Sequence, residues 1–135
     1  MVEKIDVITH KSRELIDITP HIEKIVEKTK IREGIVILYV PHTTAGLIIN
    51  EGADPAVRDD ILNTLSYLIP RNKNYKHLEG NADAHIQSSV IGCEKTIFIE
   101  NGTILLGRWQ AIFFAEFDGP RQREVYIKIV ETSKH

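Results

Sequence analysis

The chain has 135 residues, of which 42% are hydrophobic and 27% are charged, and its formal net charge is −2. This length suits one domain with a buried core, and the charge balance gives no general attraction to nucleic acid or an anionic membrane. The single cysteine, Cys93, excludes an internal disulfide and a cysteine zinc cage. There is no secretory signal pattern and no apolar run long enough to cross a bilayer. These features predict a soluble cytoplasmic domain.

The first third of the chain predicts two strands with a helix between them. Residues 3–8 alternate loosely between polar and apolar, as strand residues do. Thr19 and Pro20 are typical of a helix start, a cap followed by proline at the first helical position, and Gly34 is expected to end that helix. Ile35–Val40 is a continuous apolar run rich in β-branched residues. It predicts a strand that is buried on both faces.

The middle of the chain predicts a short strand and two helices. The strand is Leu47–Asn50. Asp54 and Pro55 repeat the signal of a cap followed by proline, and the apolar face of this second helix continues until Pro70 ends it. After a polar loop, Ala82–Ile91 has the pattern of a short third helix.

The last third predicts β structure. Asn101-Gly102 between two apolar runs is a strong signal for a hairpin, because a type I′ turn needs positive φ at both central residues. Residues 108–117 and 124–130 then alternate as strands do. The expected fold is a single α+β domain over residues 1–135, with a largely antiparallel sheet, two main helices and one short helix.

Three histidines are candidates for chemistry. His42 follows the end of the predicted buried strand, where scaffolds often present reactive groups, although it could instead only cap that strand. His77 lies in the polar loop and His85 near the start of the short helix. Each alone is a weak signal. As a set they could hold a divalent metal, zinc or magnesium, with three protein ligands and an open position.

Four carboxylates lie between residues 51 and 60, in the turn before the second predicted helix and in its first turns, and their positions suggest different roles. Asp54 is best explained as a helix cap, and Asp59 as a solvated charge in the first turn of the helix. Asp60 lies on the flank of the apolar stripe, from where it could reach a site. Glu51 leaves a strand, so it is either exposed at a turn or directed into a cleft.

The same region also has groups that suit an anion. Hydroxyls and free N–H groups in a glycine-containing turn favour phosphate, and arginine adds bidentate contacts. Trp109 could form a flat wall of such a pocket, or it could belong to the core. The candidates for anion binding are Thr43, Thr44 and Gly46, with Arg108, Arg121 and Arg123.

Three blocks of sequence together resemble one known family. They are HTTAGLIINEGADPAVRDDI from His42, YKHLEGNADAHIQSSVIG from Tyr75, and NGTILLGRWQAIFFAEFDGPR from Asn101, which is followed by Arg123. In this order they resemble the YjbQ-like family, also called secondary thiamine-phosphate synthases. The resemblance extends from about Ile35 to Ile129, which is most of the chain.

The resemblance implies an α+β fold with a large antiparallel sheet, assembled as a homotrimer with sites near the subunit boundaries. It implies a cleft with His42, His77 and His85, with Glu51 and Asp60 close by, and often a metal such as zinc. It also implies a weak thiamine-phosphate synthase activity, in which hydroxymethylpyrimidine diphosphate loses pyrophosphate and is captured by thiazole phosphate.

This hypothesis gives the candidate residues distinct roles. Glu51, Asp60 and His85 would be catalytic, the histidines would hold the metal, and Thr43, Thr44, Arg123 and Trp109 would bind the phosphorylated substrate. Two alternatives stay open from the sequence. One is a metal-assisted hydrolase of a phosphorylated metabolite, with Glu51 or Asp60 as the base. The other is a non-catalytic trimeric protein that binds a ligand.

Overall fold

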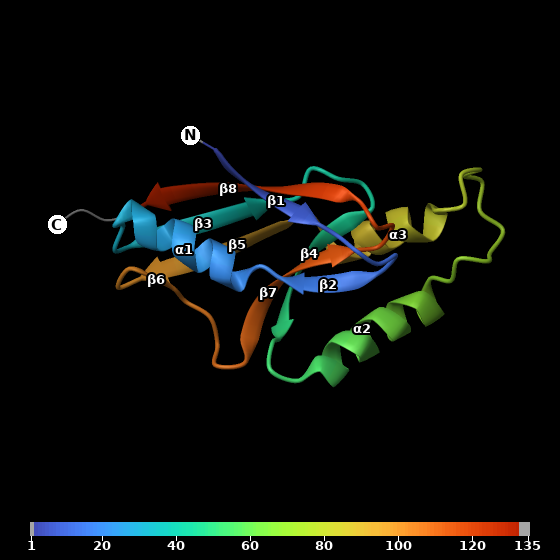
Figure 1. The fold of residues 1–135 in the computed structure, drawn as a ribbon, viewed down its shortest axis with the longest axis horizontal. Helices are drawn as coiled ribbons and strands as arrows, with labels where there is room; N and C mark the ends of the chain where they lie inside the picture. The colour runs from blue at the N-terminus through green and yellow to red at the C-terminus, as the bar shows by residue number, and fades with distance from the viewer. Residues whose placement is uncertain (1, 133–135) are drawn as a thin grey trace.

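The computed structural model describes residues 2–132, and in this range it has eight strands and three helices (Figure 1). The expected α+β class is confirmed. The helices are α1 (Thr19–Thr29), α2 (Pro55–Leu68) and α3 (Ala82–Ile91). The strands are β1 (Glu3–Ile8), β2 (Glu14–Asp17), β3 (Gly34–Tyr39), β4 (Ala45–Glu51), β5 (Glu94–Glu100), β6 (Thr103–Ile104), β7 (Gln110–Glu116) and β8 (Gln122–Glu131).

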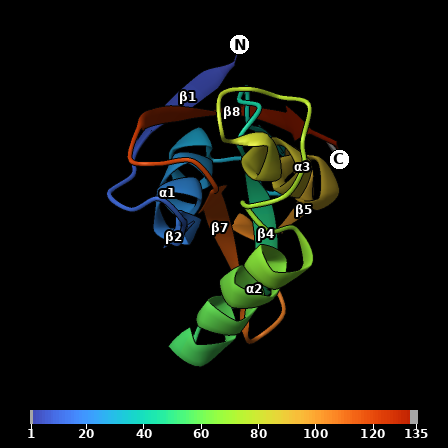
Figure 2. The ribbon, with the colours of Figure 1, turned by 90° about the vertical axis from the view of Figure 1, so that its right-hand side faces the viewer.

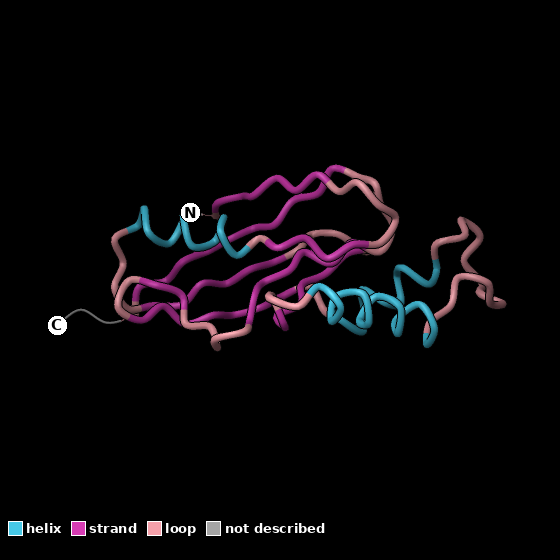
Figure 3. Tube along the Cα trace, turned by 60° about the horizontal axis from the view of Figure 1, so that its bottom comes forward, coloured by secondary structure: helices cyan, strands magenta, loops and turns pink. Residues whose placement is uncertain are grey.

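The strands form two antiparallel sheets (Figure 3). The five-stranded sheet has the order β1-β8-β3-β5-β6, and the three-stranded sheet has the order β2-β7-β4. The helices belong to the long connections between the sheets: α1 joins β2 to β3, and α2 with α3 joins β4 to β5. The loop between α2 and α3 projects from one end of the molecule (Figures 1 and 3).

The main core lies between the two sheets and α1. On β3, Val36 and Leu38 point into this core and are fully buried, whereas Ile35 and Ile37 point to the other face and are only partly buried. The expectation that Ile35–Val40 is buried on both faces is therefore wrong. Among the described residues nothing covers the outer face of the five-stranded sheet, so the apolar side chains there stay partly open to solvent.

Strand β7 is buried on both faces and separates two apolar clusters. Ile112 and Phe114 face the main core. Ala111, Phe113 and Ala115 face a second cluster, which α2 and α3 cover from outside. Helix α2 covers this cluster loosely, because none of its residues is fully buried, and Figure 2 shows it projecting away from the body of the sheets.

A polar network ties the two outer helices to the strands. Gln87 of α3 is fully buried, and its side-chain amide donates to the carbonyls of Leu65 and Ile69 at the end of α2, at 3.2 and 3.1 Å. Arg13, from the turn before β2, donates to the side chains of both Gln87 and Asp83. Since a helix leaves its last carbonyls without intrahelical partners, Gln87 acts as the C-terminal cap of α2.

The ends of α1 differ from the sequence expectation. Thr19 is inside the helix rather than its cap, and its hydroxyl accepts from the backbone N–H of Ile112 at 2.8 Å. The helix ends at Lys30, which adopts positive φ. Gly34 instead begins β3, where an added Cβ would lie 2.3 Å from the carbonyl oxygen of Val130. The glycine therefore permits close strand packing, not a helix end.

Other local predictions are confirmed. Asp54 caps α2 by accepting from Ala56 N–H at 3.0 Å. Asn101 and Gly102 have φ of 53° and 81°, as a type I′ hairpin between β5 and β6 requires. No helix in the described range is long and apolar enough to cross a membrane.

Candidate active site

A cleft of about 440 Å³ lies where the ends of β3 and β8 meet α3 and the loop before it. We call it the histidine cleft, because the three candidate histidines all line it. Loops supply most of the lining, as is common for functional sites on a rigid sheet. The lining residues are Pro41, His42, Thr43, Thr44, His77, Glu79, Asn81, His85, Asp118, Arg121 and Arg123.

His42 is fixed by β8. Its Nε2 accepts the backbone N–H of Glu124 at 2.9 Å, so the neutral ring carries its proton on Nδ1. Partial burial and the nearby positive charge of Arg123 lower the pKa of His42. The neutral ring is thus favoured at pH 7, and it can accept a proton on Nε2 only by giving up the hydrogen bond from β8.

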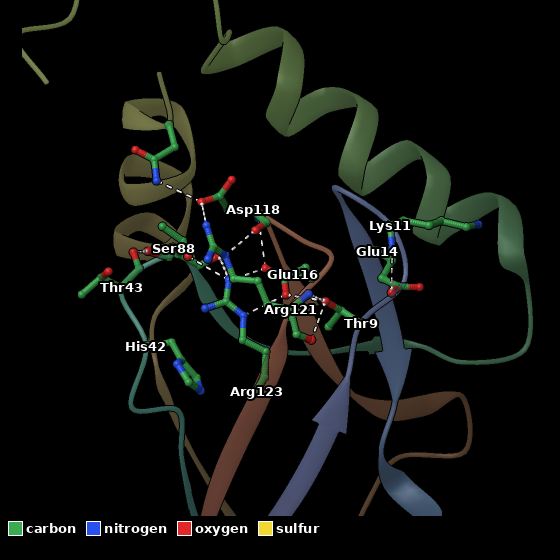
Figure 4. Close-up of polar contacts among 12 residues, drawn as sticks. Thr9, Lys11, Glu14, His42, Thr43, Ser88, Glu116, Asp118, Arg121 and Arg123 are labelled. Atoms are coloured by element: carbon green, nitrogen blue, oxygen red, sulfur yellow. Dashed lines mark hydrogen bonds and ion pairs between the residues drawn. The ribbon is translucent and has the colours of Figure 1, made fainter. Parts of the chain in front are cut away.

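Beside His42 lies a buried ion pair between Glu116 and Arg123 (Figure 4). The sequence predicted Arg123 as a site residue but not Glu116. Glu116 accepts from Arg123 Nε and from Thr9 Oγ1, both at 2.8 Å, and from Asp118 N–H at 3.0 Å. Arg123 Nη2 donates to the second carboxylate oxygen and to Thr44 Oγ1. Burial alone would raise the pKa of Glu116, but these hydrogen bonds outweigh it and lower the pKa.

The sequence holds a signal for this pair. Along β7, Glu116 falls on the same face as Ile112 and Phe114, which point into the main core. A carboxylate on such a face needs a buried partner. Arg123 likewise shares a face of β8 with buried Val125. Strand parity therefore points to both residues, but it cannot tell that the two faces meet.

The guanidinium of Arg123 has a donor to spare. Its Nε and Nη2 are bound as above, and within the described residues Nη1 makes no hydrogen bond and is not among the buried unsatisfied atoms. Arg123 is 5% exposed and lines the cleft. Nη1 is therefore the part of this side chain that can reach a ligand.

A second arginine lies at the mouth of the cleft. Arg121 Nη2 donates to Asp118 Oδ2 at 2.9 Å, and Asn81 Nδ2 donates to the same oxygen at 2.9 Å. These bonds and the positive charge of Arg121 outweigh the effect of burial and lower the pKa of Asp118. Asn81 precedes α3, so this network brings the N-terminus of α3 next to the arginines.

The other two histidines face each other. The rings of His77 and His85 are edge to face, with centroids 5.1 Å apart. However, the described residues contain no group of three or more His, Cys, Asp or Glu side chains close enough to hold a metal ion, and Nε2 of His42 is used by Glu124. As arranged, these residues do not fit a three-histidine metal centre, and the metal site stays a prediction.

Both proposed catalytic carboxylates, Glu51 and Asp60, lie outside the lining of the histidine cleft of their own chain. Glu51 Oε2 accepts from the backbone N–H of Ala53 at 2.7 Å, so it closes the turn before α2. Asp60 is exposed on α2.

Trp109 also lies apart from the cleft. It is 58% exposed, its ring stacks on Arg108 at 4.9 Å, and it lines a separate hollow with Gly52 and Ala53. The length of β7 separates Trp109 from Glu116, roughly 20 Å for an extended strand.

The threonines and the glycine have different roles. Thr44 is buried against Arg123, and Thr43 lines the cleft with its side chain exposed. Gly46 lies against the end of α3, because an added Cβ would be 2.5 Å from the carbonyl oxygen of Gly92. This glycine therefore serves packing, and the anion candidates that remain in the cleft are Thr43, Thr44, Arg121 and Arg123.

The fold and the cleft define an α+β protein with two antiparallel sheets and a polar site at the strand ends. A family model described as UPF0047 protein YjbQ-like matches residues 3–132. The chain belongs to this family, which confirms the resemblance of its sequence to the YjbQ-like family. The thiamine-phosphate synthase activity that the resemblance implies stays a prediction.

Relatives cover nearly the whole chain. The UPF0047 protein MJ1081 of Methanocaldococcus jannaschii is 58% identical over 96% of this chain and 94% of the relative. YugU of Bacillus subtilis is 44% identical over 96% of this chain and 99% of the relative. A crystal structure of a YjbQ/UPF0047 family protein from Clostridium acetobutylicum is 45% identical, covers 95% of this chain and 99% of its own, and has a TM-score of 0.93.

Proposed function

We propose that the histidine cleft binds phosphorylated small molecules and that the protein is a cytoplasmic transferase of the thiamine-phosphate synthase type. It would join hydroxymethylpyrimidine diphosphate to thiazole phosphate and release pyrophosphate. The observation that carries the proposal is the spare Nη1 of Arg123, held by Glu116 beside the neutral ring of His42. The resemblance of the sequence blocks selects this reaction among those that use a diphosphate.

The reaction needs negative charge to be stabilised. The bond between carbon and oxygen breaks with its electron pair on pyrophosphate, while the thiazole nitrogen forms a new bond to that carbon. Arg121 and Arg123 would bind the diphosphate as charge grows on it, together with the hydroxyl of Thr43. His85, when protonated, would donate to the departing oxygen, with His77 against its ring to orient it.

The proposal includes assembly as a homotrimer. The outer face of the five-stranded sheet presents Ile35, Ile37, Tyr39, Phe98 and Val130, and register places Phe98 and Val130 on either side of Ile35. Phe98 is 64% exposed. Such a contiguous apolar face on a soluble protein favours burial against another copy.

Assembly would also account for the residues that one chain leaves outside the cleft. Glu51 and Trp109 lie at one corner, since Gly52 N–H donates to the carbonyl of Trp109 at 2.8 Å. Asp60 lies in the first half of α2, which begins next to this corner. In this proposal they act as residues of a neighbouring copy that close the cleft.

The test is product formation by the purified protein with Mg²⁺ and both phosphorylated precursors. We expect thiamine phosphate from the wild type, loss of most of it in His85→Ala, and unchanged product in His21→Ala, which removes an exposed histidine on α1. Equal product from His85→Ala would refute the assigned site. Release of phosphate from phosphorylated metabolites without thiamine phosphate would favour the hydrolase instead.

A further inference from the structure

Residues 9–13, which connect β1 to β2, contact both walls of the histidine cleft. We call this connection the strap. One wall carries the two arginines and consists of residues 118–123, and the other wall is α3 with His85. None of the described residues that line the cleft belongs to the strap. Any effect of the strap on the cleft must therefore pass through its contacts with these two walls.

The strap holds the arginine wall through Thr9 (Figure 4). The Thr9 N–H donates to the carbonyl of Arg121 at 2.9 Å, and Thr9 Oγ1 accepts the Arg121 N–H at 2.8 Å. The same hydroxyl donates to Glu116 at 2.8 Å, and Glu116 is the carboxylate that fixes Arg123. The hydroxyl of Thr9 thus supports the backbone of one arginine and the buried partner of the other.

The strap holds α3 through Arg13. The guanidinium donates to the side chains of Asp83 and Gln87, which are both buried and lie one turn apart on the same side of the helix. His85 lies about 160° around the helix from Asp83. It is therefore on the opposite side of α3, where its ring meets that of His77.

Two polar anchors on different sides fix the rotation of α3 about its axis. Ser88 Oγ donates to the carbonyl of Thr43 at 2.5 Å, and Arg13 holds the side away from His85. Without Arg13 the helix keeps the bond from Ser88, and a small turn about that bond would carry His85 away from its place in the cleft. Lysine cannot replace this arginine, because it lacks the planar fork that binds two acceptors at once.

We infer that Arg13 is a positioning residue for His85 and Thr9 is one for Arg121 and Arg123, so that the strap sets how the proton donor faces the anion site. The inference rests on the proposed function, which makes His85 that donor. The two contacts go to different walls, and so their losses should have different consequences. Anion binding depends on the arginine wall, whereas proton donation depends on α3.

The variants Arg13→Gln and Thr9→Val test this as a pair. In Arg13→Gln we expect pyrophosphate to bind within about twofold of the wild type in calorimetric titration, while kcat with both phosphorylated precursors falls about tenfold, because a misplaced catalytic group slows the reaction without removing binding contacts. In Thr9→Val we expect pyrophosphate to bind about tenfold more weakly, because the arginines lose their orientation. Lys11→Gln, which removes an exposed cation of the strap, is the matched control and should change neither quantity.

The ring of His85 gives a readout that needs no turnover. Its NMR signals should shift in Arg13→Gln and equally in Arg13→Lys, and should stay in place in Lys11→Gln. The melting temperature checks that each variant is folded, and Arg13→Lys, which keeps a charged donor, decides if Arg13→Gln is not.

Equal losses of pyrophosphate affinity in the Arg13 and Thr9 variants would overturn the inference, because a general loss of structure predicts them. Unmoved His85 signals in both Arg13 variants, or a wild type that binds no pyrophosphate, would also overturn it. If the affinities and the NMR signals behave as expected but the wild type forms no thiamine phosphate, the proposed reaction fails while the positioning roles of the strap stand.

Discussion

The buried pair of Glu116 and Arg123 allows a test of what holds the site together. Their exposed fractions are 0% and 5%, and Glu116→Gln keeps the shape of the side chain while it removes the charge. The guanidinium then stays buried without a counter-ion, and breaking a buried pair from one side typically costs about 3–5 kcal/mol. Glutamine keeps one carbonyl acceptor, so we expect the free energy of unfolding to fall by about 3 kcal/mol.

Urea unfolding at pH 7, followed by circular dichroism at a fixed protomer concentration, measures this loss. Glu124→Gln is the control, because it breaks the exposed pair with Lys4, and exposed pairs contribute about 0–1 kcal/mol. Equal losses in the two variants would refute the reasoning that burial decides the cost.

The same pair predicts a pH dependence. Because the folded protein lowers the pKa of Glu116 below its usual 4.5, the stability from this group is complete above pH 4.5 and is lost as the pH falls through the lowered value. In Glu116→Gln this part of the acid destabilisation should be absent. An unchanged acid limb of the stability curve in the variant would contradict the assignment.

Three further predictions concern other parts of the fold. The pKa of His42 is lowered from 6.5, so its NMR titration midpoint should lie below 6.5, and the protein should lose stability as the pH falls from 6.5 toward that midpoint; a midpoint above 6.5 would contradict the burial argument. Gly46→Ala should lower the melting temperature, because its Cβ would meet the rigid backbone of Gly92; an unchanged melting temperature would show that α3 moves freely. Gln87→Leu should cost about 2–4 kcal/mol of stability by leaving buried partners unsatisfied and should speed amide exchange in α2; uniform exchange rates would count against its capping role.

Local signals predicted local structure well. The Asn101-Gly102 turn and the Asp54 cap depend only on neighbours in the chain, so the sequence is enough to place them. Thr19 and Gly34 carry the same kinds of signal, but contacts with distant strands decide their roles. Local propensity is a weak prior where a residue packs against the rest of the fold.

The candidate site shows the same division. His42 and His85 were recognisable from residue type and position, and they do meet in one cleft. Glu116 matters because the buried face of β7 meets the buried face of β8, which brings it to Arg123. The alternation of residues along each strand predicts which residues share a face, but not that these two faces meet. The resemblance implies that Glu51 lies near the histidines, whereas within one chain it closes the turn before α2. The sequence around Glu51 does not distinguish a carboxylate in a cleft from one that closes a turn.

The loose packing of α2 has a consequence for motion. A segment with no fully buried side chain can open locally at a lower free energy than the sheets. The loop with His77 starts at the end of this helix, and the cap from Gln87 is its link to α3. Local opening of α2 would therefore shift the loop that carries His77 relative to His85 on α3, while the hydrogen-bonded strands of both sheets stay paired.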